Sequence, residues 1–198
     1  IDTFLNGMVD ASKTPIFQEC IAVLKEFFPG ESDYIDTITP HVSGSVTVST
    51  LHGCPPDEIE RIASYLLEKK HLHTFVKCNP TILGYETARS ILDSMGYDYI
   101  AFDDHHFKED LQYADAVPMF HRLQALADKE GLEFGLKLSN TFPVDVKAGE
   151  LPSEEMYMAG KSLFPLTTTM AAMMAKEFGG KLRLSYAGGA DAFNIDKL

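Results

Sequence analysis

The sequence contains no tryptophan, and only three of its 198 residues are cysteines. Cys20, Cys54 and Cys78 are too few, and odd in number, for the disulfide framework of a secreted protein, so we expect reduced thiols and a cytoplasmic location. No apolar run approaches the roughly 20 residues that span a bilayer, which predicts a soluble protein without a membrane partner. Basic residues are also scarce: 17 Lys and Arg face 29 Asp and Glu, and this net charge of -12 argues against nucleic acid as a partner.

Several motifs that would define a site are missing. No GxGxxG stretch indicates a dinucleotide site, and three separated cysteines cannot hold an iron–sulfur cluster. The residues that could ligate zinc or iron lack the spacing of a CxxC or HExxH motif, so we predict no metal site. They are His52, Cys54, His73, Cys78, Asp103, His105 and His106. The Asp103–His106 run is equally typical of a solvated, hydrogen-bonded loop.

The chain is long enough for one domain with a single core. Residues 1–44 predict an N-terminal helical segment, with two helices before Pro29-Gly30 and a polar connection after it. From Ser45 onward, short β-rich runs alternate with amphipathic helices. The expected strands are Val46–Thr50, Thr74–Cys78, Tyr99–Asp103, Phe134–Leu138 and Leu182–Tyr186. The expected helices are Asp57–Lys70, Glu86–Met95, Asp115–Lys129 and Leu163–Phe178.

This alternation predicts an α/β fold with a parallel sheet, either an open doubly wound sheet or a TIM-type (β/α) barrel. Polar residues or glycines follow the expected strands, namely Cys54, Asn79, Asp103-Asp104-His105-His106, Ser139-Asn140 and Gly188-Gly189. Because barrel enzymes build their sites at the carboxyl ends of their strands, this pattern favours the barrel. Five strands cannot close a barrel of eight, so residues 45–198 are expected to form a partial barrel. The start at Ile1, without methionine or signal sequence, and the abrupt end suggest a piece of a longer protein.

The stretch from Ser45 to Asp57 places a thiol and an imidazole at a strand exit. Its β-branched residues predict a strand, His52-Gly53-Cys54 forms the exit, and Pro55-Pro56 can open a helix. The neighbouring imidazole and the helix N-terminus would favour the thiolate form of Cys54. Cys54 is therefore a candidate for proton transfer, with a metal ligand and an inert buried thiol as alternatives.

Two lysines interrupt apolar strands, Lys77 in Phe-Val-Lys-Cys-Asn and Lys137 in Gly-Leu-Lys-Leu-Ser-Asn. A lysine in such a strand is costly unless it is paired, so we expect each to reach an anion or a carbonyl at the barrel mouth. Two alternatives stay open. The lysines are also typical of Schiff-base chemistry, and a structural ion pair with Asp103 or Asp104 would satisfy them equally.

Gly188-Gly189 follows an apolar strand, where glycine allows backbone amides to approach a phosphate. A plain tight turn is the alternative. Gly160, followed by the polar Lys161-Ser162 and a helix, could offer a second set of amides.

Three longer stretches carry a resemblance to a known family. They are Ser-Thr-Leu-His-Gly-Cys-Pro-Pro-Asp-Glu-Ile-Glu-Arg-Ile-Ala-Ser-Tyr-Leu, Phe-Val-Lys-Cys-Asn-Pro-Thr and Ser-Tyr-Ala-Gly-Gly-Ala-Asp-Ala-Phe-Asn-Ile. On these stretches the chain resembles the flavin-barrel region of the YgfK-type selenate reductases, large iron–sulfur flavoproteins akin to dihydropyrimidine dehydrogenase. The resemblance covers nearly the whole chain, from about Ile1 to Ile195. A more distant similarity is to the FMN barrel of the dihydroorotate dehydrogenases.

The resemblance implies a flavin site with a strand-end lysine, an Asn-Thr pair and glycines near the phosphate, and a loop cysteine that transfers a proton. The matching residues are Lys77, Asn140-Thr141, Gly160 and Gly188-Gly189, with Cys54 as the loop cysteine. With the strand-exit residues added, the expected cofactor-binding set is Lys77, Asn79, Lys137, Asn140, Thr141, Gly160, Gly188 and Gly189, and the catalytic candidates are Cys54 and His52. Lys137 competes with Lys77 for the flavin-facing position. The iron–sulfur clusters and the FAD or NAD(P)H sites of a full-length relative would lie outside this sequence.

These features together predict the FMN-type barrel of a multicentre oxidoreductase that acts on a small molecule and contacts other domains or subunits of a redox complex. The alternatives are a cofactor-free barrel that docks neighbouring redox domains and a Schiff-base lyase. No residue identifies the substrate, and none indicates selenate.

Overall fold

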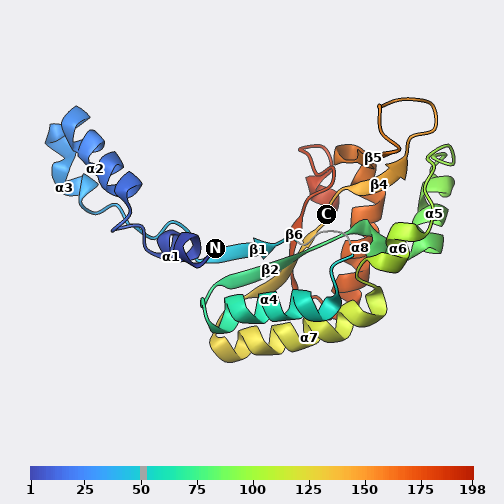
Figure 1. The fold of residues 1–198 in the computed structure, drawn as a ribbon, viewed down its shortest axis with the longest axis horizontal. Helices are drawn as coiled ribbons and strands as arrows, with labels where there is room; N and C mark the ends of the chain where they lie inside the picture. Colours follow the sequence, from blue (N-terminus) through green and yellow to red (C-terminus); the bar gives the residue numbers. More distant parts are fainter. Residues whose placement is uncertain (50–52) are drawn as a thin grey trace.

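The computed structural model describes residues 1–49 and 53–198 (Figure 1). The helices are α1 (Asp2–Val9), α2 (Pro15–Phe27), α3 (Ser32–Ile35), α4 (Pro56–Glu68), α5 (Tyr85–Ser94), α6 (His105–Glu109), α7 (Tyr113–Glu130) and α8 (Phe164–Glu177). The 3₁₀ turns are η1 (Pro29–Glu31), η2 (Pro80–Leu83), η3 (Gly160–Leu163) and η4 (Ile195–Lys197). The strands are β1 (Ser45–Val48), β2 (His73–Cys78), β3 (Phe134–Leu138), β4 (Phe142–Asp145), β5 (Glu155–Met158) and β6 (Arg183–Tyr186). Two residues of the predictions, Thr50 and His52, lie outside the described residues.

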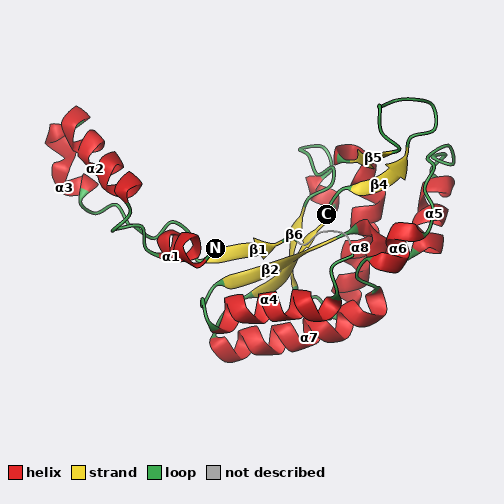
Figure 2. Cartoon of the chain, in the orientation of Figure 1, coloured by secondary structure: helices red, strands yellow, loops and turns green. Residues whose placement is uncertain are grey.

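The central sheet has four parallel strands in the order β1-β2-β3-β6 (Figure 2). Its register pairs Lys77 with Lys137, and Leu138 with Tyr186. The predicted α/β fold with a parallel sheet is therefore confirmed. β1 and β6 form the two edges, so the sheet within the described residues is an open arc and not a closed barrel.

Helices α4, α7 and α8 pack against one face of this sheet, where Val76 and Leu136 join a buried cluster with side chains of all three helices. Alternation along β2 explains the choice of face, because Val76 and Cys78 are buried whereas Lys77 between them is only half-buried. The opposite face, which we call the inner face, carries Phe75, Lys77 and Lys137. It corresponds to the lumen side of a closed barrel.

The α4 helix begins where the sequence predicts it. Pro55 caps it and Pro56 occupies its first turn, where a missing N–H costs nothing, and Asp57 and Glu58 lie near the positive end of the helix dipole. The predicted apolar face is buried against the sheet and α7, apart from Ile62, which is 38% exposed.

Glycine at position 135 allows the central strands to approach on the inner face. A Cβ there would collide with the ring of Phe75, its register partner on β2, and would lie 2.6 Å from the carbonyl oxygen of Arg183 on β6. Such a contact is shorter than van der Waals packing permits. Because Gly135 has no side chain, the Phe75 ring can lie over β3.

The expected strand Tyr99–Asp103 is wrong, because these residues lie in no strand. The Arg89 guanidinium donates hydrogen bonds to the carbonyl oxygens of Ile100 (2.6 Å) and Tyr97 (3.0 Å) and stacks 4.6 Å from the Phe102 ring. These contacts satisfy backbone groups that a strand would offer to a neighbouring strand. Asp103 and Asp104 consequently follow no strand and instead lead into α6, which begins with His105 and His106.

An antiparallel hairpin that the sequence pattern did not predict follows β3. β4 pairs with β5, with Phe142 opposite Met158, and the connecting segment extends above the sheet in Figure 1. The Asp145 amide donates to the Ala101 carbonyl at 2.8 Å, which ties the hairpin to the loop between α5 and α6. The hairpin thus covers part of the carboxyl side of the sheet.

The N-terminal segment contacts the body through α1 and through the Gly44 carbonyl, which accepts a hydrogen bond from the His73 amide at 2.9 Å. Leu5 packs with side chains of β1 and α4, and the Tyr65 hydroxyl donates to the Asp2 carboxylate at 2.9 Å. α2 and α3 stand apart from the sheet (Figure 1), and no α2 residue is buried. Within the described residues, no helix is both long and apolar enough to cross a membrane.

Candidate functional site

Two lysines lie side by side at the carboxyl ends of the central strands. Lys77 on β2 and Lys137 on β3 are register partners, so both side chains project from the inner face. Both are half-buried, and neither forms an ion pair with a described residue. Because like charges directly opposite each other destabilise a sheet, this pair is expected to have a function that offsets its cost.

The ion pairs that sequence reasoning offered as an alternative for these lysines do not form. Asp104 instead binds Lys108 one helical turn later, with 2.6 Å between Nζ and Oδ2, and Asp103 accepts a hydrogen bond from the His105 amide at 2.9 Å. Both carboxylates therefore bind residues of the α6 helix.

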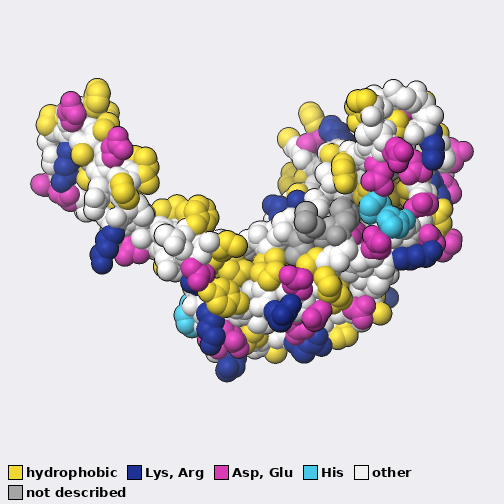
Figure 3. All heavy atoms as spheres, viewed as in Figure 1, with side chains coloured by type: hydrophobic (Ala, Val, Ile, Leu, Met, Phe, Trp, Pro, Cys, Tyr) yellow, Lys and Arg dark blue, Asp and Glu magenta, His cyan; other side chains and the backbone are white. Residues whose placement is uncertain are grey.

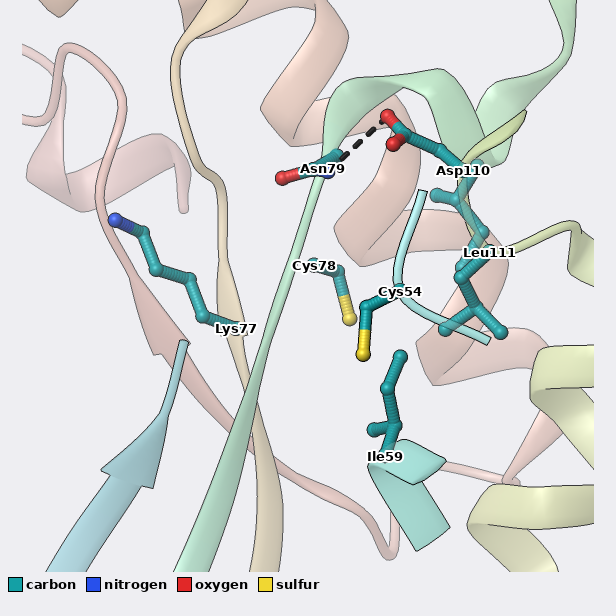
Figure 4. Close-up of a pocket in the computed structure, with 8 residues that line it drawn as sticks. Cys54, Ile59, Lys77, Cys78, Asn79, Asp110 and Leu111 are labelled. Atoms are coloured by element: carbon teal, nitrogen blue, oxygen red, sulfur yellow. Dashed lines mark hydrogen bonds between the residues drawn. The ribbon is translucent and has the colours of Figure 1, made fainter. Parts of the chain in front are cut away.

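Asn79 and Asn140 follow the two lysine-bearing strands and contact each other. The Asn140 amide nitrogen donates to Asn79 Oδ1 at 3.0 Å, and Asn79 Nδ2 donates to Asp110 Oδ2 at 3.1 Å. In Figure 4 the Asn79 oxygen lies on the same side of β2 as the Lys77 side chain. Thr141 comes next in the chain, immediately before β4. The structure thus brings Lys77, Lys137 and both asparagines together, as predicted for strand exits.

Asp110, which the sequence analysis missed, is the centre of this network. The residue is 5% exposed, and its carboxylate also accepts hydrogen bonds from the Gly53 amide (3.1 Å) and the Thr81 hydroxyl (2.7 Å). Nothing local distinguishes it from its acidic neighbours. The role of Asp110 becomes visible only in the fold, where the end of α6 places it against the exit of β2.

Cys54 lies on the other side of β2 from the Lys77 ammonium group (Figure 4). It lines a small cavity of about 20 Å³ together with Lys77, Cys78, Asn79 and Asp110, and it packs against the core. Burial raises the pKa of the Cys78 thiol to about 12, so this neighbour is uncharged at physiological pH. The structure therefore places Cys54 and Lys77 at one small cavity, with the Lys77 ammonium group directed away from the thiol (Figure 4).

The three predicted glycines meet where two loops cross. A Cβ on Gly189 would lie 2.8 Å from Lys161 Cα, and one on Gly188 would lie 2.5 Å from Thr167 Oγ1. Within the described residues, the amides of Gly188 and Gly189 donate no hydrogen bond. Gly160 begins the turn η3 that leads into α8. The glycines therefore permit close packing of the loops and also leave amides free for a ligand.

A cavity of about 300 Å³ opens beside these loops. Its lining includes Gly189, Lys161, Ser162 and Asp191. The Lys161 ammonium lies 2.9 Å from an Asp191 oxygen, and this contact holds the pKa of the carboxyl below its usual value. The residues that line the cavity thus include Gly189, whose amide donates no hydrogen bond within the described residues, and the Lys161–Asp191 ion pair, which has no net charge.

Histidine side chains lie among acidic ones over α6 on the face shown in Figure 3. His106 Nε2 is 2.8 Å from Glu155 Oε1, which links α6 to β5, and His105 lies 3.4 Å from Glu109. No group of three or more His, Cys, Asp or Glu side chains within residues 1–49 and 53–198 is placed to hold a metal ion. The cluster joins the helix to the hairpin.

Comparison with known proteins places this geometry in a family. The model of the family described as "Oxidoreductase YgfK, N-terminal TIM-barrel domain" matches residues 1–198. The chain is 42% identical over 207 residues to "Putative oxidoreductase YgfK" of Escherichia coli strain K12, and equally to that of Escherichia coli O157:H7. The alignment covers 97% of this chain and 20% of each relative, so the chain spans a fifth of the length of these curated relatives. No solved structure matches it.

Proposed function

We propose, because the chain belongs to the family of the N-terminal TIM-barrel domain of oxidoreductase YgfK, that it is the FMN-type flavin barrel of a multicentre iron–sulfur oxidoreductase. Its substrate is a small molecule. We assign the iron–sulfur clusters and the FAD or NAD(P)H sites to other parts of the full-length protein, because this chain spans a fifth of the length of its curated relatives, and those parts are the proposed partners of the barrel.

The observation that carries this proposal is the adjacent pair of Lys77 and Lys137 on the inner face, without an ion pair among the described residues. Positive charge beside the flavin ring is one of the ways in which a protein tunes this cofactor. Two ammonium groups that repel each other without a ligand are both satisfied by one anionic group between them. The lysines therefore fit a flavin whose ring gains negative charge on reduction.

The remaining predicted residues fit the same cofactor. The free amides of Gly188 and Gly189 suit a phosphate, and Gly160 places the start of α8 beside them. Asn140 and Thr141 follow the exit of β3, the strand that carries Lys137, and would orient the ring. The bound flavin supplies hydride transfer.

Cys54 is the proposed proton-transfer residue, assisted by His52. Since its thiol lies across β2 from the Lys77 ammonium group, proton transfer to a substrate on the inner face requires the loop at Gly53–Cys54 to turn toward that face. Loop movements of this kind occur in many enzymes on a microsecond to millisecond timescale.

The test uses the full-length protein. Purified protein should show the visible absorbance of an oxidised flavin, and extraction should release FMN in about one equivalent per barrel. A variant with Lys77→Met and Lys137→Met should lose most of this FMN. Lys181→Met is the matched control, because Lys181 is exposed and lies before β6 at the amino end of the same sheet. A folded protein without FMN that also fails to bind added FMN would refute the proposal.

A second candidate function is a cofactor-free barrel that docks neighbouring redox domains. It is favoured by the position of Cys54 and by the close loop packing at Gly189, since both have a purely structural explanation. In that case flavin, if present in the full-length protein, would stay bound after both lysines are replaced.

A further inference from the structure

We infer that Asp110 is a positioning residue that determines which atom Asn140 presents beside the lysine pair. This inference rests on the proposed function, because it concerns the same ligand site. Its consequence is specificity: the site favours a ligand edge on which an N–H donor neighbours a carbonyl or anionic oxygen.

The first step is the chemistry of a buried carboxylate. Asp110 Oδ1 accepts from the Gly53 amide, and Oδ2 accepts from Asn79 Nδ2 and the Thr81 hydroxyl, at 3.1, 3.1 and 2.7 Å. An ionised carboxylate can only accept hydrogen bonds. The Asn79 side chain must therefore turn its NH₂ group toward Asp110.

In the second step, the orientation of the Asn79 side chain determines that of Asn140. With its NH₂ group on Asp110, Asn79 directs its oxygen toward Asn140, and Asn140 must donate its own NH₂ group at 3.0 Å. The oxygen of Asn140 is then left for a ligand. It lies at the exit of β3, three residues after Lys137, so the site offers ammonium donors next to one amide acceptor.

The third step predicts what happens when the carboxylate becomes an amide. In Asp110→Asn, the oxygen of the new side chain stays on the Gly53 N–H, because a backbone donor cannot reverse its role. Its NH₂ group then faces Thr81, whose hydroxyl can accept, and Asn79, whose amide must flip. Asn140 flips in turn and presents NH₂ to the ligand. The hydrogen bonds among Gly53, Thr81, Asn79, Asn140 and position 110 are retained, but the polarity of the site is inverted.

An exchange of the two residues restores the original polarity. In the double variant Asp110→Asn with Asn79→Asp, the new amide donates to the carboxylate at position 79. The other oxygen of that carboxylate accepts from Asn140, which again presents its oxygen. The single variant Asn79→Asp, by contrast, places two carboxylates against each other.

The experiment uses full-length apoprotein with added FMN as the probe. We expect Asp110→Asn to weaken FMN binding by about 10- to 100-fold, because two donors are opposed in a buried site. The exchange variant should bind FMN within about threefold of wild type. Thr81→Val is the control: it removes one hydrogen bond from the same carboxylate without reversing an amide, so FMN affinity should stay within about threefold.

Hydrogen exchange of residues 79–83 gives a second readout that does not depend on flavin. Asp110→Asn should retain wild-type protection there, Asn79→Asp should lose it by about tenfold or more, and the exchange variant should regain it. A purely structural Asp110 predicts the opposite for Asp110→Asn, namely lost protection with no specific effect on FMN.

The outcomes separate the two hypotheses. If wild-type apoprotein binds FMN and Asp110→Asn binds it equally well, or if the exchange variant restores neither binding nor protection, the positioning role is overturned. If wild-type apoprotein binds no FMN, the proposed function fails. The orientation of the asparagines is then decided by hydrogen exchange alone, supported by recovery in the exchange variant and overturned by its absence.

Discussion

Replacing Lys137 by methionine should stabilise the ligand-free protein and weaken its binding of flavin. Lys137 and Lys77 are register partners on adjacent strands, and neither forms an ion pair among the described residues. Methionine keeps most of the apolar stem and removes the charge. A residue kept for function at a cost in stability has this signature, because its removal moves the two properties in opposite directions.

The expected size follows from the spacing of the strands. Adjacent strands lie about 4.8 Å apart. Two unit charges at that distance repel by about 0.9 kcal/mol in water and about 3.5 kcal/mol at an effective dielectric constant of 20. Because flexible lysine stems let the ammonium groups separate, we expect the lower end, a gain of about 0.5–1 kcal/mol. The lost interaction with an anionic ligand is larger, about 1.5–3 kcal/mol, or about 10- to 150-fold in affinity.

The assay combines hydrogen exchange across β2 and β3 in full-length apoprotein with a titration of FMN. Slower exchange in Lys137→Met should be largest at low ionic strength and should diminish in high salt, because salt screens the repulsion. Lys181→Met should change neither property. If Lys137→Met lost stability and kept its FMN affinity, the lysine would be part of the packing and the argument for a functional pair would be wrong.

Two further predictions concern the sheet and its thiols. Gly135→Ala should destabilise the sheet by about 1–3 kcal/mol, because its Cβ would lie 2.6 Å from the Arg183 carbonyl oxygen. The control Gly30→Ala should be neutral, because no atom lies within 4 Å of the added Cβ. Hydrogen exchange of β2 and β3 would detect this difference in stability, and equal exchange in the two variants would contradict the clash. Peptide mapping after alkylation at pH 8 should find Cys20, which is exposed, modified and Cys78 protected. Since burial raises the pKa of Cys78 from its usual 9.0 to about 12, the unfolded state loses its proton first, and the stability supplied by this thiol should fall as the pH rises from 9 toward 12. Modification of Cys78 at the rate of Cys20 in folded protein would show that it is not enclosed.

Strands with strong local signals could be predicted from the sequence. β2, β3 and β6 and the helices α4, α5, α7 and α8 lie within two residues of their expected bounds, because apolar periodicity and proline or glycine ends are local properties. The region from Tyr99 to Asp103 had the composition of a strand, yet Arg89, eleven residues before Ile100, binds the Ile100 carbonyl. That contact depends on how α5 ends and has no local signature.

The candidate site shows the same division. The positions of Lys77, Lys137, Asn79 and Asn140 followed from the rule that sites lie at strand exits. The orientation of Cys54 and the role of Asp110 did not, since both depend on how α4 and α6 pack against β2. Strand order gives position along the sheet, and helix packing decides which side chains meet.

The contact between Gly135 and Phe75 limits how this fold can change in evolution. Both Phe75 and the Arg183 carbonyl occupy the space of a side chain at position 135. A smaller residue at position 75 would free only part of that space, because the backbone of β6 cannot be replaced. Position 75 can therefore change while position 135 stays glycine, but position 135 cannot gain a side chain, even after position 75 has changed. Homologues that keep this strand register should vary at 75 and be invariant at 135.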